Sequence, residues 1–550
     1  MFRSLVVMFM AFASTIFAQT RSQNYQLLLQ NISDEPRLHG KCGLPAFAAL
    51  QQAAAKQPEL SALFKRTFAR PQLPLSYVTP GGKFRFHYAV TGSNAVNPTS
   101  TQVAGVPDYI YEAGLAAQRA YNLLHVQLGF DLPMSDQNVD GPEYDFYVID
   151  EPADRYGETA WDFLDASGRA PGYSFVDNDF TGYATTGLAA LRVTVAHEYF
   201  HGVQLNYRLR DEDIYFLEMS STWFEDFAYD EVNDYYFYLR DFFNNTNTQL
   251  AETDGYESSV WLHYLVKRMR TSRIMLDLWK RVKIEPALAS FKNVLEAAPY
   301  SLPFASAFGE FSAWCYFTGS RADTARYFEE GDKYPPVKFA QTVAISRDTT
   351  ISGGLGAVAA NFYRVLRNPQ NFQVLLPGAT ANRWAVSVIY RNERQQFRLS
   401  RNDGLTPLDV PIADPAKGDT FVVIVANPNL SAGSSNYQLQ LKPAGNLQLT
   451  IVLENPWPNP FRPLKSSAST GSITFPFRIN GRASLDAAII REDGKVMKRY
   501  GLGELPADLY PEEMSWDGLD ESGKRAGSGV YFLRLWSGEA HDLTKFVLVN

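Results

Sequence analysis

The chain has 550 residues, of which 45% are hydrophobic and 20% charged, and its formal net charge at pH 7 is −8. This length and composition predict several domains with sizeable cores and exclude a largely disordered protein. The acidic balance, 51 Lys and Arg against 59 Asp and Glu, argues against nucleic acid as a partner. With only two cysteines, a disulfide-built scaffold and a four-cysteine metal site are excluded.

The first eighteen residues are typical of a secretory signal peptide. Arg3 supplies the positive charge, residues 5–17 form a short apolar stretch, and Ala18 is a small residue suited to cleavage. The stretch is shorter than the ~20 residues that a membrane span needs, and no later segment is long and apolar enough. We therefore expect residues 1–18 to be a signal peptide and the mature protein to be secreted, without a transmembrane span.

Residues 19–80 are expected to form an N-terminal, propeptide-like segment, with a helix at 44–66 and a Pro- and Gly-rich joint at its end. From residue 81 to 334 strand and helix patterns are mixed, which predicts an α+β domain. Its strands are expected at 84–90, 144–149 and 173–176, and its helices at 109–128, 188–205, 217–229, 232–243, 256–270 and 303–317.

After Pro335 and Pro336 the hydrophobic period changes from helical to alternating. Residues 335–445 predict a β-sandwich module, because short alternating runs are separated by Gly, Asn and Pro. The expected strands are 372–375, 384–388, 421–425 and 437–441. A short linker at 443–446 leads to a second β module, at 446–550.

The most informative segment reads Ala196-His197-Glu198-Tyr199-Phe200-His201, the pattern H-E-x-x-H within a predicted helix. A spacing of four puts both imidazoles on one helix face, where they can bind one tetrahedral Zn²⁺. Glu198 is then placed to act as general base on a water whose pKa the zinc lowers towards ~7. The alternative is a pair of structural histidines on an amphipathic helix.

The third ligand decides the class of zinc site. A continuation to H-x-x-G-x-x-H is absent, because Gln204 and Tyr207 occupy the glycine and histidine positions. The next predicted helix offers Glu218 and Glu225, which are seven residues apart and hence on one face. We favour Glu218 as the ligand, since small serines follow it and allow close helix packing. Glu225 is expected to support a ligand or to face solvent.

A hydrolase of this type also needs a hydrogen-bond donor to the oxyanion. Tyr256, at the start of a predicted helix, is the candidate, and the alternative in a chain with 30 tyrosines is a packing role. Weaker candidates are Tyr235, Tyr236 and Tyr238.

The predicted strand 173–176 comes just before the motif helix. At a sheet edge this strand could pair with an extended peptide substrate. Asp177 and Asp179 follow it, and clustered carboxylates can bind Ca²⁺, although an Asx turn is the favoured interpretation.

Residues 196–201 and 217–223 together resemble the gluzincin metallopeptidases. The second piece is similar to the aminopeptidase-type segment W-x-x-E-G-x-A, whose Glu binds zinc, and this resemblance implies Glu218. Residues 256–259 are similar to the family's Y-x-K-G helix start, whose Tyr stabilises the oxyanion, but the glycine is absent and the interval from Glu218 is shorter. The exopeptidase signature G-x-M-E-N is absent, which favours an endopeptidase. More closely, residues 84–330 resemble a group of secreted bacterial metalloproteases.

The C-terminal module resembles the type IX secretion sorting domain, which has an immunoglobulin-like fold. The matching pieces are residues 455–461, 516–518, 520–523 and 528–532. The resemblance implies export by the type IX secretion machinery to the surface or surroundings of a Gram-negative bacterium, followed by removal of this domain.

Cys42 and Cys315 allow three interpretations. On an oxidising export route they can form a disulfide that ties the N-terminal segment to the end of the α+β domain. Residues 36–45 loosely resemble the cysteine-switch segment of matrix metalloprotease propeptides, in which a thiolate occupies the open position on zinc. Two unrelated free thiols are the third interpretation.

Together these patterns and resemblances predict a multidomain protein: an α+β zincin-like metallopeptidase domain followed by two all-β sandwich, immunoglobulin-like modules. The expected function is that of a secreted zinc endopeptidase acting on protein or peptide substrates. His197, His201 and Glu218 are its expected metal ligands, and Glu198 and Tyr256 its expected catalytic residues. The alternative is a cell-surface binding or adhesion protein with a structural zinc site.

Overall fold

The computed structural model describes most residues of the chain. They are 21–30, 41–152, 155–344, 348–366, 372–376, 384–391, 397–402, 408–410, 420–431, 433–443, 449–463, 471–479, 481, 483–505, 508–510 and 512–549. The predicted signal peptide lies outside them, as do most of the predicted linker and half of the segment that resembles a cysteine switch.

Three helices form the N-terminal part: α1 (Arg21–Leu29), α2 (Leu44–Lys56) and α3 (Pro58–Thr67). The single helix expected at 44–66 is interrupted at Gln57, whose backbone is extended. The cause is Pro58, because the residue before a proline is disfavoured in the helical region. Tyr25, Phe47 and Phe68 are buried in the same hydrophobic core as the following domain, so this part packs against that domain.

A five-stranded sheet follows, in the order β1-β2-β3-β5-β4. Its strands are β1 (Leu75–Val78), β2 (Phe84–Tyr88), β3 (Tyr144–Ile149), β4 (Gly157–Trp161) and β5 (Gly172–Asp177). β2, β3 and β5 run parallel, while β1 and β4 pair antiparallel at the two ends. The expectation that residues 173–176 form an edge strand is wrong. β5 lies between β3 and β4, and β4 is the edge.

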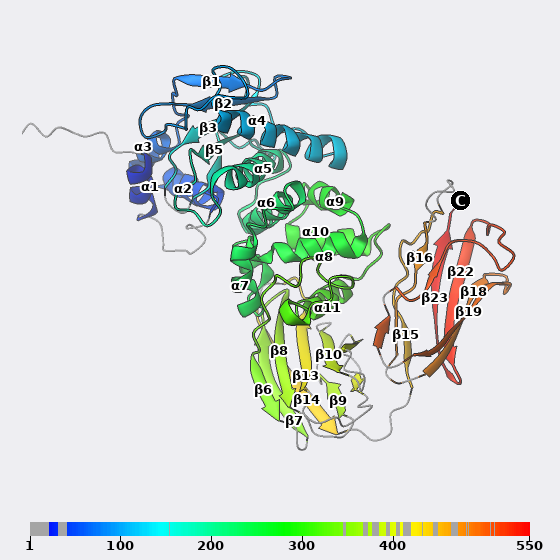
Figure 1. Cartoon of the computed structure of the whole chain (residues 1–550). Coiled ribbons are helices and arrows are strands. Elements are labelled where there is room, and N and C mark those ends of the chain that lie inside the picture. The colour runs from blue at the N-terminus through cyan, green and yellow to red at the C-terminus, as the bar shows by residue number, and fades with distance from the viewer. Residues whose placement is uncertain are drawn as a thin grey trace, which may run out of the picture.

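Two long helices pack beside this sheet, α4 (Asp108–Tyr121), which continues as a π-helical turn at Asn122–Leu128, and α5 (Gly187–Leu205). Figure 1 shows both on the side of the sheet that faces the remaining helices. α5 comes very close to β3 at Gly202, where an added Cβ would lie 2.4 Å from the Tyr144 hydroxyl oxygen. This close approach holds the H-E-x-x-H helix against the strands.

A second helical layer extends away from α5 (Figure 1). It consists of α6 (Ile214–Ala228), α7 (Tyr236–Asn244), α8 (Val260–Met269), α9 (Arg273–Val282), α10 (Ala287–Glu296) and α11 (Phe304–Trp314). Four of them overlap helices that the sequence predicts, whereas α9 and α10 were not predicted individually. The layer forms one continuous hydrophobic core with the sheet and with α1 to α3.

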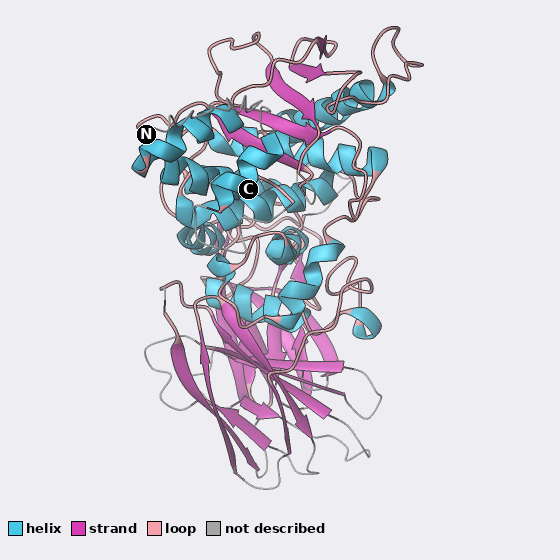
Figure 2. Cartoon of the chain, turned by 90° about the vertical axis from the view of Figure 1, so that its left-hand side faces the viewer, coloured by secondary structure: helices cyan, strands magenta, loops and turns pink. Residues whose placement is uncertain are grey.

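The next module consists of two sheets, with strand orders β11-β10-β13-β8-β6 and β12-β9-β14-β7. The strands are β6 (Gln341–Ala344), β7 (Thr349–Leu355), β8 (Ala359–Leu366), β9 (Phe372–Leu375), β10 (Ala385–Arg391), β11 (Phe397–Asn402), β12 (Leu408–Val410), β13 (Thr420–Asn427) and β14 (Ser435–Pro443). They enclose a separate core that includes Val388 and Leu439. The outer face of the first sheet contributes Phe362 and Ile424 to the main core, and its strands β10 and β13 contact α11. Figure 2 shows this strand-rich half beneath the helical half.

The C-terminal module has a third core, which includes Trp516 and Phe546. Its strands are β15 (Ile451–Leu453), β16 (Ile473–Thr474), β17 (Phe477–Ile479), β18 (Ala483–Arg491), β19 (Val496–Leu505), β20 (Asp508–Tyr510), β21 (Ser515–Trp516), β22 (Gly529–Ser537) and β23 (Ala540–Leu548). The expected multidomain α+β arrangement is therefore confirmed. Within the part of the chain that the structure describes, no helix has the length and apolar character needed to cross a membrane.

The packing of α5 on the sheet can be tested with Gly202→Ala. The added methyl group requires the Tyr144 ring to move, and overpacking of this kind costs about 1–3 kcal/mol. We expect a lower midpoint for the calorimetric transition of the α+β domain. The control is Leu188→Ala in the first turn of the same helix, where the side chain is 41% exposed, and its effect should stay within about 0.5 kcal/mol. Equal midpoints for the two variants would contradict the close approach.

Candidate metal centre

The two histidines of the motif lie on one face of α5, as their spacing requires. The Nε2 atoms of His197 and His201 are 2.9 Å apart, and both side chains are buried. Each ring has a partner at its other nitrogen, since His197 Nδ1 is 2.5 Å from Glu225 Oε1 and His201 Nδ1 is 2.8 Å from Gln204 Oε1. With Nδ1–H donating to these oxygens, the Nε2 lone pairs of both neutral rings point at the same place.

Glu218 on α6 completes this group. Its Oε2 lies 3.2 Å from His197 Nε2, and its Oε1 lies 3.4 Å from His201 Nε2. Oε1 is buried and accepts no hydrogen bond from protein. A tetrahedral zinc with ligands at ~2.0–2.2 Å holds neighbouring ligand atoms ~3.3–3.6 Å apart. The two separations to Glu218 are close to that range, and the 2.9 Å between the two Nε2 atoms is shorter. The three side chains can therefore hold one divalent cation if the two imidazoles move slightly apart.

The electrostatics of the cluster favour a positive charge at this point. Burial opposes protonation of His197, but the carboxylates of Glu225 and Glu218 outweigh it and raise the pKa of the ring to about 10. Burial also disfavours the Glu218 carboxylate, yet the two imidazoles hold its pKa well below the usual range. A bound metal ion satisfies the same demand when both rings are neutral ligands.

Cys42 is the fourth member of the group. Its Sγ and the ligand atoms of His197, His201 and Glu218 all lie within 4.8 Å of one another, and all four residues are buried. The interpretation of Cys42 and Cys315 as a disulfide is wrong, because both thiols are free. Cys315 is the residue that follows α11 and does not belong to this group. Sequence reasoning had placed Cys42 near a metal only through the loose resemblance to a cysteine switch.

Glu198 lies beside the candidate ligands and does not belong to the group that could hold a metal. Its Oε2 accepts a hydrogen bond of 2.7 Å from Thr159 Oγ1 on β4 and is 3.7 Å from Cys42 Sγ. Burial raises the pKa of Glu198 against the opposing effect of the two imidazoles. A carboxylate held in this way next to a cation site is suited to accept and return a proton.

Tyr256 reaches the same region from the turn before α8. Its hydroxyl oxygen accepts a hydrogen bond of 3.1 Å from the backbone N–H of Cys42, and its ring stacks near His197. Gly255 makes this approach possible, because a Cβ there would lie 2.6 Å from the Cβ of Glu218, and its φ is +101°. Of the weaker candidates, Tyr238 packs on Tyr256, while the Tyr235 hydroxyl binds Glu330 and Tyr334.

Two supporting residues of the centre could not be assigned from the sequence pattern. Gln204 binds His201 and donates its amide N–H to the backbone oxygen of Leu217 and to Ser221 Oγ on α6, so it joins the two helices that carry the candidate ligands. Its position three residues after His201 on the same helix was the available signal. Lys41 contacts Glu225 from the N-terminal segment, and no sequence motif indicates that this lysine belongs to the centre.

The calcium interpretation of Asp177 and Asp179 is not supported by the geometry. Asp177 Oδ1 accepts the backbone N–H groups of Asp179 and Phe180, and Oδ2 accepts that of Glu151. The carboxylate is therefore engaged in an Asx turn, the favoured interpretation. Among the described residues, no metal-capable group includes this pair.

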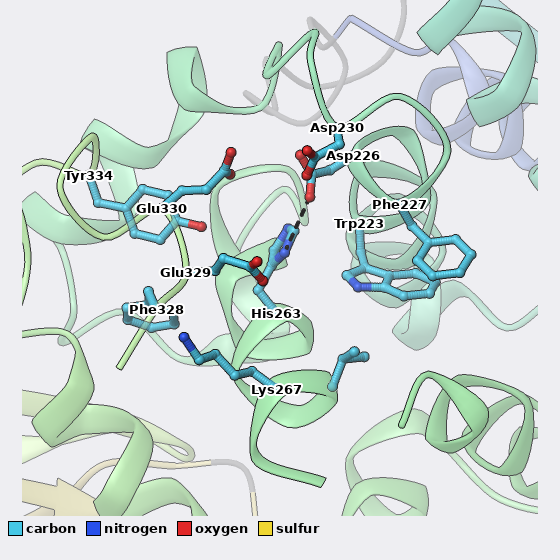
Figure 3. Close-up of a pocket in the computed structure, with 11 residues that line it drawn as sticks. Trp223, Asp226, Phe227, Asp230, His263, Lys267, Phe328, Glu329, Glu330 and Tyr334 are labelled. Carbon is cyan, nitrogen blue, oxygen red and sulfur yellow. Dashed lines mark ion pairs between the residues drawn. The ribbon is translucent and has the colours of Figure 1, made fainter. Parts of the chain in front are cut away.

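A second acidic group, Asp226, Asp230 and Glu330, lies next to a cavity of about 250 Å³. Figure 3 shows the His263 ring pointing towards Asp226, with a separation of 3.7 Å between His263 Nδ1 and Asp226 Oδ2. Burial and the charge of Glu330 raise the pKa of Asp226 to about 8. None of the predicted site residues lines this cavity.

The sequence matches no family model and no curated protein. Among solved structures, the chain is similar to a mutant of PliG-Ec, a periplasmic lysozyme inhibitor from Escherichia coli (9% identity, TM-score 0.14, covering 18% of this chain and 96% of that one). It is also similar to PorZ, a surface component of the type-IX secretion system of Porphyromonas gingivalis (14% identity, TM-score 0.13, covering 30% of this chain and 22% of that one). A third similar structure is a β-glucuronidase from Ruminococcus gnavus (9% identity, TM-score 0.13, covering 37% of this chain and 36% of that one). TM-scores of this size show neither a shared overall fold nor a shared activity.

The hydrogen bond behind His197 can be tested with Glu225→Gln. The neutral amide is a weaker acceptor for Nδ1–H, and partners of this kind change metal affinity by about 10–100-fold. We expect zinc affinity, measured by competition with a chromophoric chelator, to fall by that factor, and to fall further in Glu218→Gln. Glu212→Gln, an exposed residue just before α6, is the control. Equal affinity of Glu225→Gln and this control would contradict the assignment.

Proposed function

We propose that the protein is a secreted zinc endopeptidase of gluzincin type, with His197, His201 and Glu218 as metal ligands. One observation carries the proposal: a buried carboxylate that belongs to no ligand set, Glu198, lies beside the three ligands and is held by Thr159. A purely structural metal site has no use for such a base. Bound zinc would supply a Lewis acid that polarises a carbonyl group and lowers the pKa of a water.

Each side chain has a definite task in this mechanism. Glu198 accepts a proton from the attacking water and passes it to the leaving amine, while Thr159 fixes its orientation. The Tyr256 hydroxyl donates to the oxygen of the scissile carbonyl as negative charge develops there. Glu225 and Gln204 keep the ligand imidazoles in the tautomer that leaves Nε2 free for the metal.

The edge strand β4 supports a peptide substrate in particular. β4 carries Thr159 beside the cluster and is the last strand on this side of the five-stranded sheet. An extended chain can add to such an edge and so present successive peptide bonds. The sequence pattern suggested residues 173–176 for this role, but Gly157–Trp161, at the sheet edge, are better suited to it.

For export, we propose that residues 446–550 are a type IX sorting domain. The basis is the resemblance of its turn segments and the presence of a separate hydrophobic core in this module. The protein would then act at the surface or in the surroundings of a Gram-negative cell.

A structural zinc site is the second candidate, and one observation favours it. Cys42 adds a fourth ligand to two histidines and a glutamate, and closed four-ligand sets are typical of structural sites. In this case the β modules would hold a partner, and the protein would be a surface binding or adhesion protein.

Glu198→Gln separates the two candidates. It preserves the ligands, so zinc content should remain at one ion per chain, whereas hydrolysis of casein and of a peptide panel should fall by about 10²–10⁴-fold. The comparison is made with Cys42 present and in a Cys42→Ser background, so that a blocked site does not hide the activity. If zinc binds but neither background cleaves any substrate, the endopeptidase proposal fails and the structural site stands.

A further inference from the structure

The residues just before α2 lie along the outer edge of β4, where a substrate would bind under the proposed function. The N–H of Gly43 donates to the oxygen of Gly157 at 2.9 Å, and the N–H of Tyr156 donates to the oxygen of Lys41 at 2.8 Å. Cys42 and Gly157 form a parallel β-bridge. The chain thus occupies the edge of the sheet with its own residues 41–43.

The same three residues also occupy the reactive groups of the centre. Cys42 places its thiol among the ligand atoms and next to Glu198, the proposed base. Its backbone N–H donates to the hydroxyl of Tyr256, the proposed oxyanion donor. Cys42, which comes from outside the α5–α6 pair, therefore blocks the metal position, the proposed base and the proposed oxyanion donor.

Lys41 anchors this contact through buried charge. Its Nζ lies 2.7 Å from Glu225 Oε2 and 2.6 Å from Asp234 Oδ2, and the lysine side chain is only 3% exposed. Glu225 is the carboxylate that also supports His197, so the anchor and the metal ligand share one partner. Charge pairs buried to this degree hold a segment in one register, because a misplaced ammonium would leave carboxylates unpaired.

Close packing fixes the next residue. A Cβ on Gly43 would lie 2.3 Å from Glu158 Oε2 and 2.6 Å from its Cγ, so only glycine fits against β4 here. Beyond it, α2 and α3 pack on the domain, and residues 71–74 then lead to β1 as an exposed or half-buried link. Residues 41–70 form one docked segment that is connected to the domain through this link.

We infer, on the basis of the proposed peptidase function, that residues 41–70 are an internal inhibitor in which the Cys42 thiolate serves as a fourth, displaceable metal ligand. Binding of the sulfur releases the thiol proton and fills the position that a substrate needs. Hydrolysis begins only when this segment leaves the edge of β4.

Cobalt-substituted full-length protein tests the ligand directly. We expect wild type to bind one Co²⁺ and to show a thiolate-to-cobalt charge-transfer band in the near ultraviolet. Cys42→Ser should lose this band but keep the visible d–d bands from the two histidines and Glu218. Cys315→Ser, which removes the other buried thiol, is the matched control and should keep the band. The wild-type spectrum alone is informative, so the test does not depend on a variant folding.

Peptide hydrolysis by the zinc forms then tests inhibition. Activity should rise by about tenfold or more in Cys42→Ser. The substitution removes the sulfur–metal bond, which is one of the contacts that hold the segment, and so increases the fraction of molecules in which the segment is undocked. Cys315→Ser should match wild type, and circular dichroism verifies that both variants are folded.

The outcomes separate the two proposals. A chain that binds Co²⁺ without a charge-transfer band overturns the Cys42 ligand while leaving the peptidase proposal intact. If the band disappears in Cys42→Ser but hydrolysis does not increase, Cys42 is a permanent metal ligand. This result overturns the proposal that residues 41–70 are an inhibitor. If no variant binds Co²⁺, the metal centre fails and the inhibitor fails with it.

Discussion

Buried carboxylates around the α5–α6 pair impose the constraint on which the rest of the structure depends. Glu198, Glu218, Glu225 and Asp234 are all almost completely shielded from solvent, and each requires a donor or a cation at close range. Two histidines, Lys41 and Thr159 supply these partners, and they come from three different parts of the chain. The chain can therefore bury this centre only if the N-terminal segment, the sheet edge and the two helices assemble together.

Much of this arrangement follows from local sequence patterns. The motif helix and the strands at 84–90 and 144–149 were predicted closely. β2 alternates between buried and half-buried side chains, whereas β3 is a short, almost fully buried run and α5 is a long apolar segment that contains no proline. Glu218 was preferred over Glu225 on helix packing and resemblance, and the geometry brings Glu218 to the Nε2 atoms and Glu225 to Nδ1. Both placements rest on spacing along a single helix, which is local information.

The misses concern contacts between distant segments. β4 carries no alternating pattern, because all of its residues are buried, so the sequence did not reveal that it displaces β5 from the sheet edge. Lys41 is an isolated cation in the sequence, and its partners lie 184 and 193 residues away. The helix break at Gln57 had a local signal, Pro58, which was overlooked because the helical hydrophobic pattern continues on both sides of it. Strand order and buried charge pairing are properties of the assembled chain, and periodicity does not report them.

The link at residues 71–74 has a consequence for affinity. While the chain is continuous, the segment faces its site at a high effective concentration, so contacts of modest strength suffice to keep it docked. Once the link is severed, the same contacts must hold against dilution, and the effective concentration falls to that of free segment in the surroundings. Cutting the link would therefore make release of residues 41–70 depend on dilution, although no contact at the candidate metal centre had been altered.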